Sequence, residues 1–227
     1  FKNKKIHKCR NINEIVENCT IIITCLPSPK SVNIVIKKIL PKVKKNDLWI
    51  EMSTTDKNEM IKLSRLFIKK GGMVLEAPIT GGEHRAKSGN ISIFTAGDRK
   101  CFYRAFPILS KMGHKILYCG SIGNASILKI ITNYLASLHL IGIGEALAVS
   151  KKNKIDLGLT HKAIKISSGN SFVNETETKV ILGGSYDVGF TMDLVNKDIR
   201  LFNKLATQYK IPVELGKILN KKFNIGI

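Results

Sequence analysis

The stretch IGNASILKIITNYLASLHLIGIGEALAVS, residues 122–150, divides the chain into two parts of different character. Its apolar residues predict one long helix, and Lys129 and Glu145 are its only formally charged residues. The longest charge-free run, residues 130–144, is too short to span a bilayer and includes polar residues. We therefore expect a core helix that joins two domains and no membrane association.

Before this helix, β-branched runs alternate with amphipathic segments, a pattern typical of an α/β fold with a mainly parallel sheet. The expected strands cover residues 21–25, 48–52, 73–76, 91–96 and 116–119, and the expected helices cover residues 57–70 and 101–111.

After the long helix the strand signals stop and only helical patterns remain. The expected helices cover residues 159–168, 171–182, 192–208 and 213–221. The sequence therefore predicts two domains, an α/β domain over residues 1–120 and an all-helical domain over residues 121–227.

The composition is that of a soluble globular protein, with 44% hydrophobic and 24% charged residues. The formal net charge of +20 is extreme and raises the question of nucleic acid as a partner. The basic residues are mostly Lys, however, and the Arg-rich or aromatic-interleaved motifs of nucleic-acid binders are missing. Because Lys, Ile and Asn are abundant together, we attribute the charge to drift toward AT-rich codons.

Cysteine usage indicates a reducing compartment. The five cysteines are odd in number and widely spaced, without a C-x-x-C pair, which argues against a disulfide framework or structural zinc. The start does not resemble a signal or transit peptide. We expect a cytoplasmic protein, with the mitochondrial matrix as the alternative for a eukaryotic source, and no metal.

Three expected strands run into loops of small and polar residues. In an open parallel sheet such loops lie at the carboxyl edge, where ligands bind. Small residues let a ligand approach the backbone, and amides beside glycines favour anionic oxygens. The three loops are Leu26-Pro27-Ser28, Ser53-Thr54-Thr55 and Thr80-Gly81-Gly82.

Lys129 lies in the apolar long helix, four residues before Asn133, so the two side chains share one face. An ammonium in such a segment either snorkels to solvent, which is the commoner case, or serves proton transfer in a desolvated site. Helix spacing alone leaves both readings open.

The ordered motifs of the chain resemble the β-hydroxyacid dehydrogenase family, which includes 3-hydroxyisobutyrate dehydrogenase and the tartronate-semialdehyde and glyoxylate/succinic-semialdehyde reductases. The resemblance covers essentially the whole chain and is specific because the motifs occur together and in order. They are Ile23-Thr24-Cys25-Leu26-Pro27, Glu51-Met52-Ser53-Thr54, Glu76-Ala77-Pro78-Ile79-Thr80-Gly81-Gly82, Gly123-Asn124-Ala125 with Lys129 and Asn133, and Asn196-Lys197-Asp198.

The resemblance implies a Rossmann-type domain, a helical substrate and oligomerisation domain, and an active site in the cleft between them. It implies NAD or NADP as cofactor, a small carboxylate as substrate and a homo-oligomer. It assigns cofactor contacts to Leu26, Pro27, Thr54 and Lys197. It assigns substrate binding to Thr80, Gly81, Gly82 and Asn133, and general acid/base catalysis to Lys129.

The chain departs from the family pattern at both ends. The family opens with a strand, G-x-G-x-x-G and a helix, which bind the pyrophosphate. This sequence lacks that segment, and the resemblance implies that it ends before the family's last helix. We therefore expect a chain truncated at both ends and inactive alone, from which the choice between NAD and NADP cannot be read.

Smaller departures concern single residues. Thr80 stands where Ser is usual, and Glu51 and Glu76 replace the commoner Asp. Related 6-phosphogluconate dehydrogenases have His where this chain has Thr132, and imine-reducing relatives replace the residue matching Lys129. These two differences disfavour 6-phosphogluconate and imines as substrates.

A second class of function stays open. Some relatives have lost catalysis and act as dehydrogenase-like scaffolds, one of them in a nuclear chromatin reader. The net charge of +20 favours such a scaffold, possibly associated with nucleic acid, whereas the presence of Lys129, Asn133 and Thr80 disfavours it.

Overall fold

The computed structural model describes residues 6–224 and divides into two compact units, Phe1–Lys129 (unit 1) and Ile130–Ile227 (unit 2). The termini on which we base the expectation of truncation, residues 1–5 and 225–227, lie outside the described residues. The expected domain boundary after residue 120, with the roles attached to each domain, stays a prediction.

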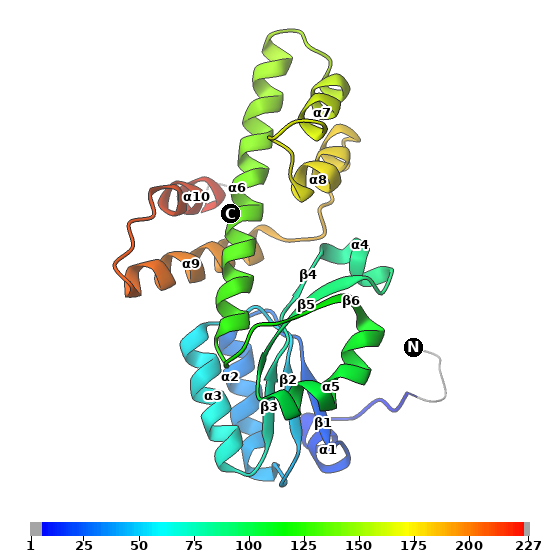
Figure 1. The fold of residues 1–227 in the computed structure, drawn as a ribbon, viewed down its shortest axis with the longest axis vertical. Coiled ribbons are helices and arrows are strands. Elements are labelled where there is room, and N and C mark those ends of the chain that lie inside the picture. Colours follow the sequence, from blue (N-terminus) through cyan, green and yellow to red (C-terminus); the bar gives the residue numbers. More distant parts are fainter. Residues whose placement is uncertain (1–5, 225–227) are drawn as a thin grey trace. The chain divides into compact units, whose positions relative to one another are not determined.

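Unit 1 alternates strands and helices, as the sequence predicts (Figure 1). Its strands are β1 (Ile21–Thr24), β2 (Leu48–Glu51), β3 (Met73–Glu76), β4 (Ile79–Thr80), β5 (Ile91–Gly97) and β6 (Gly113–Tyr118). Its helices are α1 (Ile12–Asn18), α2 (Pro29–Ile39), the short 3-10 helix η1 (Leu40–Lys42), α3 (Lys57–Lys69), α4 (Gly82–Lys87) and α5 (Arg99–Met112).

The strands form one sheet in the order β1-β2-β3-β5-β4, with β6 paired to β5. Strands β1, β2 and β3 are parallel, as are β5 and β6, which confirms the expected α/β fold with a parallel-rich sheet. The expectation does not include the reversal at β5, which runs antiparallel to β3 and β4. Only the six-residue α4 lies between β4 and β5, whereas α2 and α3 are full crossover helices.

The sheet is covered on both faces because successive strand residues point to opposite sides. On one face Trp49 and Val74 pack with Phe67 and other residues of the α1, α2 and α3 layer. On the other face Ile50 and Leu75 pack against α5. Figure 1 shows α2 and α3 on one side of the sheet and α5 on the other.

Two of the loops at the parallel edge lead directly into helices. The Ser28 hydroxyl accepts a hydrogen bond from the Ser31 amide and starts α2, with Pro29 as its first residue. The Asp56 carboxylate accepts from the amides of Asn58 and Glu59 and starts α3. Capping therefore fixes where the loops after β1 and β2 end.

Unit 2 is helical, as the sequence predicts. Helix α6 (Asn124–Lys152) begins in unit 1 and continues into unit 2. It is followed by α7 (Leu157–Lys165), α8 (Phe172–Leu182), α9 (Met192–Gln208) and α10 (Glu214–Asn224). The rings of Tyr134 on α6 and Phe202 on α9 stack with centroids 3.8 Å apart.

Helix α6 is less buried than a core helix. In its most apolar 18-residue window only 22% of the residues are buried, and Leu135 and Val149 are 42% and 63% exposed. The expectation of a buried core helix therefore describes only one side of α6. By length and hydropathy alone this helix could cross a membrane. This is weak evidence for a membrane span, because core helices of soluble proteins meet the same criterion.

Candidate active site

The loops after β1 and β2 are tied to each other through buried polar groups. Ser53 accepts a hydrogen bond on its Oγ from the Leu26 amide at 2.7 Å. Its own amide donates to the Glu51 carboxylate, also at 2.7 Å, and Glu51 accepts from the Thr24 hydroxyl as well. Leu26 is thereby held against Ser53 just after β2, and Thr54, the next residue of that loop, is half-buried. Pro27, the next residue of the loop, is exposed.

The Thr80-Gly81-Gly82 loop needs both of its glycines. Gly81 has φ +126° and Gly82 has φ +73°, conformations that side chains disfavour. A Cβ atom on Gly82 would meet nothing within 4 Å, so the backbone there is open to a ligand. Thr80 is half-buried and pairs with Ser92 of β5. A hydroxyl beside accessible backbone suits a carboxylate.

Lys129 is 6% exposed, so its side chain is not extended into solvent. It lies in α6 three residues after the buried Ser126 and four before Asn133. Burial of an ammonium is costly without compensating partners, so this position is unusual for a Lys on an apolar helix. The snorkelling interpretation therefore does not describe this side chain, although its role stays a prediction.

Asn133 and Lys197 share one partner in unit 2. The Asn133 amide donates to Asp198 Oδ2 at 2.5 Å, and Lys197 Nζ lies 2.8 Å from Asp198 Oδ1. Asp198 is 1% exposed and bridges α6 and α9. The Asn196-Lys197-Asp198 motif marks Asp198 only as the neighbour of Lys197, and local sequence does not predict this bridging position.

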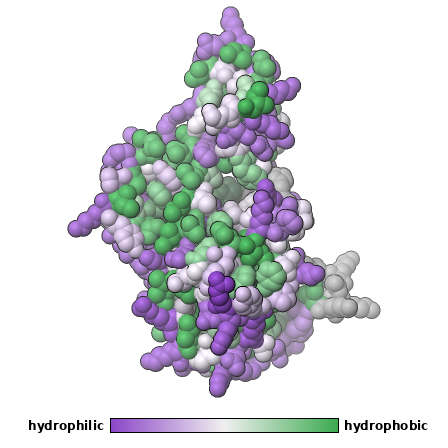
Figure 2. Space-filling model, in the orientation of Figure 1, coloured by the Kyte–Doolittle hydropathy of each residue, from purple (hydrophilic) through white to green (hydrophobic). Residues whose placement is uncertain are grey.

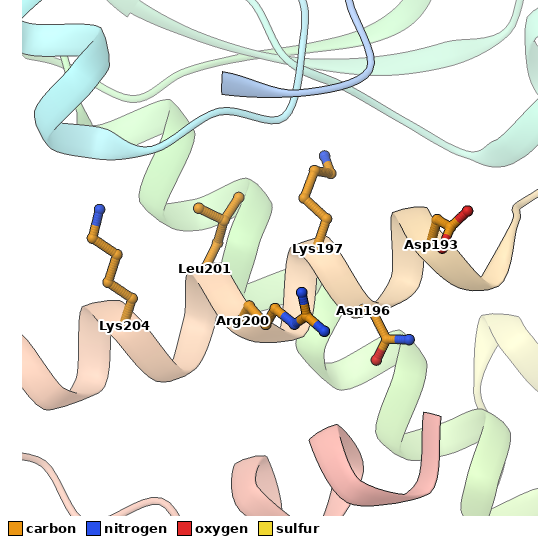
Figure 3. Close-up of a pocket in the computed structure, with 6 residues that line it drawn as sticks. All are labelled: Asp193, Asn196, Lys197, Arg200, Leu201 and Lys204. Carbon is orange, nitrogen blue, oxygen red and sulfur yellow. The ribbon is translucent and has the colours of Figure 1, made fainter. Parts of the chain in front are cut away.

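Lys197 also lines a pocket of about 460 Å³ on α9 (Figure 3). Its side chain points to the same side of the helix as Leu201 and Lys204. The other residues that line the pocket are Asp193, Asn196 and Arg200. Three cationic side chains against one carboxylate favour an anionic ligand.

The residues proposed from the sequence thus form two groups. Unit 1 holds Leu26, Pro27, Thr54, Thr80, Gly81, Gly82 and Lys129, and unit 2 holds Asn133 and Lys197. The strand-end loops and open glycine backbone of unit 1 fit a dinucleotide and a carboxylate, which bind at such edges. The sequence motifs include Glu51, Ser53 and Glu76, but they do not predict that these buried polar residues hold the loops through hydrogen bonds.

Comparison with known proteins covers both parts of the chain. Residues 1–120 match the family model for the NAD binding domain of 6-phosphogluconate dehydrogenase. Residues 123–226 match the model for NAD-binding of NADP-dependent 3-hydroxyisobutyrate dehydrogenase. Both descriptions identify NAD or NADP as the cofactor.

The curated relatives include mitochondrial 3-hydroxyisobutyrate dehydrogenase of Rattus norvegicus, which is 32% identical over 222 residues. The match covers 93% of this chain and 66% of that protein, so the chain spans about two thirds of its length. The 2-(hydroxymethyl)glutarate dehydrogenase of Eubacterium barkeri is 27% identical, with 96% of this chain and 74% of that protein covered.

A solved structure shows the same fold. The 3-hydroxyisobutyrate dehydrogenase of Mycobacterium tuberculosis, determined with L-serine, superposes with a TM-score of 0.87 at 24% identity. The superposition covers 95% of this chain and 77% of that one. On the two family models and these relatives, the chain belongs to the β-hydroxyacid dehydrogenase family.

Proposed function

We propose that this chain carries the catalytic residues of an NAD(P)-dependent oxidoreductase that interconverts a small 3-hydroxy acid and the matching semialdehyde, with Lys129 as general acid/base. Family membership supports the reaction class. The observation that carries the residue assignment is the burial of Lys129, a residue 6% exposed on α6 one turn before Asn133.

The chemistry requires a proton transfer that Lys129 can perform. In oxidation the amine takes the proton of the substrate hydroxyl, and in reduction the ammonium returns it to the developing alkoxide. The bound nicotinamide supplies the hydride chemistry. Asn133, whose amide is oriented by Asp198, would bind the substrate near the reacting carbon.

The remaining residues would bind and orient. Thr80 would donate its hydroxyl to the substrate carboxylate, and the backbone amides of Gly81 and Gly82 would donate hydrogen bonds to the same anion, with open backbone at Gly82. Leu26, Pro27 and Thr54, at the ends of β1 and β2, and Lys197 on α9 would hold the cofactor. Residues 1–120 would thus serve as the dinucleotide-binding domain and residues 121–227 as the substrate and oligomerisation domain.

We further propose a homo-oligomer without a nucleic-acid or membrane partner, located in the cytoplasm or, in a eukaryotic source, in the mitochondrial matrix. Exposed apolar side chains on the helices of unit 2 support the oligomer. Mitochondrial relatives such as the rat enzyme are consistent with the matrix alternative.

Turnover tests this proposal against the scaffold alternative. The protein as its gene encodes it should reduce NAD or NADP with 3-hydroxyisobutyrate or a similar 3-hydroxy acid, and not with 6-phosphogluconate. The substitution Thr80→Val, which keeps the shape and removes the hydroxyl, should mainly raise KM for the hydroxy acid. Lack of turnover with every 3-hydroxy acid and both cofactors, together with a salt-sensitive shift of DNA, would favour a scaffold instead.

A further inference from the structure

Glu76 joins two segments of unit 1 that carry the proposed site. It is the last residue of β3 and is 1% exposed. Its Oε2 accepts a hydrogen bond from the Gly123 amide at 2.7 Å, and its Oε1 accepts from the Ser126 hydroxyl at 2.6 Å. The backbone amides of Ala125 and Ser126 also contribute hydrogen bonds to the carboxylate.

These donors belong to the start of α6, which begins at Asn124. The first amides of a helix have no partners within the helix, and a neighbouring N-cap side chain or an anion usually satisfies them. Here a carboxylate from a strand 47 residues earlier in the chain does so. The start of α6 is thereby fixed directly to the end of β3.

The two segments that Glu76 joins, the start of α6 and the end of β3, each lie a few residues before a proposed active-site residue. On α6, Ser126 and Lys129 are three residues apart and share a face, so the rotation that Ser126 fixes also sets the direction of Lys129. On the other side, the chain leaves β3 at Glu76 and continues through Ala77 and Pro78 to Thr80 at the end of β4. Glu76 is therefore a short mechanical link between the proton-transfer group and the carboxylate-binding loop.

We propose that Glu76 is a positioning residue for the proposed reaction, which holds the first turn of α6 against the end of β3 so that Lys129 and the Thr80 loop keep one mutual geometry. The proposal rests on the function proposed above. The two carboxylate oxygens of Glu76 accept hydrogen bonds from the Gly123 amide and the Ser126 hydroxyl, which lie one helical turn apart. This pair of contacts explains why an acidic side chain is buried at this position.

Stability alone gives no reason for a carboxylate here. Burial raises the pKa of Glu76 to about 7, although Ser126 and the first amides of α6 act in the opposite direction. The ionised form is therefore unfavourable in the fold relative to an exposed Glu. The thiol of Cys119 is a titratable group that interacts with Glu76. Burial raises the pKa of this thiol, and the charge of the Glu76 carboxylate raises it further.

The matched control is Glu51, the strand-register partner of Glu76 on β2. It is also 1% exposed, and burial raises its pKa as well. Its hydrogen bonds go to Thr24 and Ser53 instead of the start of α6. Glu51→Gln therefore removes a buried carboxylate of the same kind without removing the link to α6.

The first experiment measures the link itself by amide hydrogen exchange, which does not depend on activity. In the protein as its gene encodes it, Glu76→Gln should speed exchange in peptides covering residues 123–128 by roughly tenfold or more. Glu51→Gln should leave those peptides unchanged. Unchanged exchange in both Glu76→Gln and Ser126→Ala would overturn the anchoring. Ser126→Ala removes one hydrogen bond and keeps the carboxylate, so it tests the link even if Glu76→Gln folds poorly.

The second experiment measures positioning through Lys129. Glu76→Gln should lower kcat by roughly tenfold to a hundredfold without a matching change in KM for the cofactor, and Glu76→Asp should restore part of it. In a Lys129→Met background Glu76→Gln should have no further effect, because the group through which it acts is gone. Additive losses in the double variant would overturn positioning. An inactive wild-type protein would instead refute the proposed function, while hydrogen exchange would still decide the anchoring.

Discussion

The two units bury their apolar side chains in different ways. In unit 1 the sheet carries a packed layer on each face, with Trp49, Phe67 and Leu75 fully buried. In unit 2 the buried clusters are small, and side chains such as Ile166 and Ile218 are 89% and 51% exposed. Figure 2 shows hydrophobic residues gathered on the visible surface of the helical part.

This difference shows what each unit needs in order to be stable. A sheet with helices on both faces buries the apolar side chains of both faces. Helices that pack mainly in pairs leave the apolar side chains of one face exposed to solvent. We therefore expect unit 1 to depend on its own core and unit 2 to depend on further burial, which the proposed homo-oligomer would supply.

The largest expected effect is on the core of unit 1. Phe67 is fully buried and lies 5.6 Å from Trp49 between ring centroids. Phe67→Ala should lower the free energy of unfolding by about 3–5 kcal/mol. Trp49 is the only tryptophan, so its fluorescence during guanidinium unfolding reports on unit 1. Phe106→Ala, at a position 44% exposed on α5, should change it by less than about 1 kcal/mol.

A pH-dependent effect should come from Glu76. Its pKa in the fold is about 7, above the ordinary 4.5, so the folded state binds the proton more tightly than the unfolded state. Its contribution to stability is therefore full below pH 4.5 and is lost as the pH rises toward 7. The difference in unfolding free energy between wild type and Glu76→Gln should fall by roughly 3 kcal/mol over this range. A difference that is constant or rises with pH would contradict it.

In unit 2 the corresponding buried acid is Asp198. Asp198→Ala would remove the acceptor of the Asn133 amide and the ion-pair partner of Lys197, and should destabilise unit 2 by about 1–3 kcal/mol. Circular dichroism during unfolding measures this loss, because unit 2 is helical. Asp193→Asn, an exposed change on the same helix, should cost less than about 1 kcal/mol. Equal losses would mean that the bridge contributes little.

The smallest effect on the stability of a single chain should come from the uncovered side of unit 2. Ile218→Ser on α10 replaces a half-exposed side chain and should change unfolding of the monomer by about 0.5 kcal/mol or less. Light scattering coupled to gel filtration should nevertheless show weaker assembly. A large loss of monomer stability with unchanged assembly would place Ile218 in a self-sufficient core and remove the contrast between the units.

Local sequence patterns predicted most elements of both units. Helical periodicity gave residues 192–208, the bounds of α9, and the β-branched runs gave β1, β2 and β3 to within a residue. The expected elements do not include α2, although Ser28 as N-cap and Pro29 as first helical residue are local signals for its start. The antiparallel sense of β5 was not readable, because strand direction leaves no trace in a local pattern.

The contacts that organise the candidate site were harder to predict for the same reason. Asp198 meets Asn133 across 65 residues of sequence, and Glu76 meets Gly123 across 47. Sequence indicated the residues proposed to touch ligands, because loops, glycines and an isolated Lys have local signatures. It could not indicate which residues the buried acids hold in place, since these contacts depend on where distant segments meet.

The central claim, that Lys129 is the proton-transfer group, is tested most directly by steady-state kinetics of Lys129 variants in the protein as its gene encodes it. Lys129→Met should lower kcat by roughly a hundredfold or more, the scale of losing a general acid/base. Lys129→Arg should not restore it, because a guanidinium does not release its proton near neutral pH. Cofactor affinity should stay close to that of the wild type in both. Near-normal turnover in Lys129→Met would contradict the assignment.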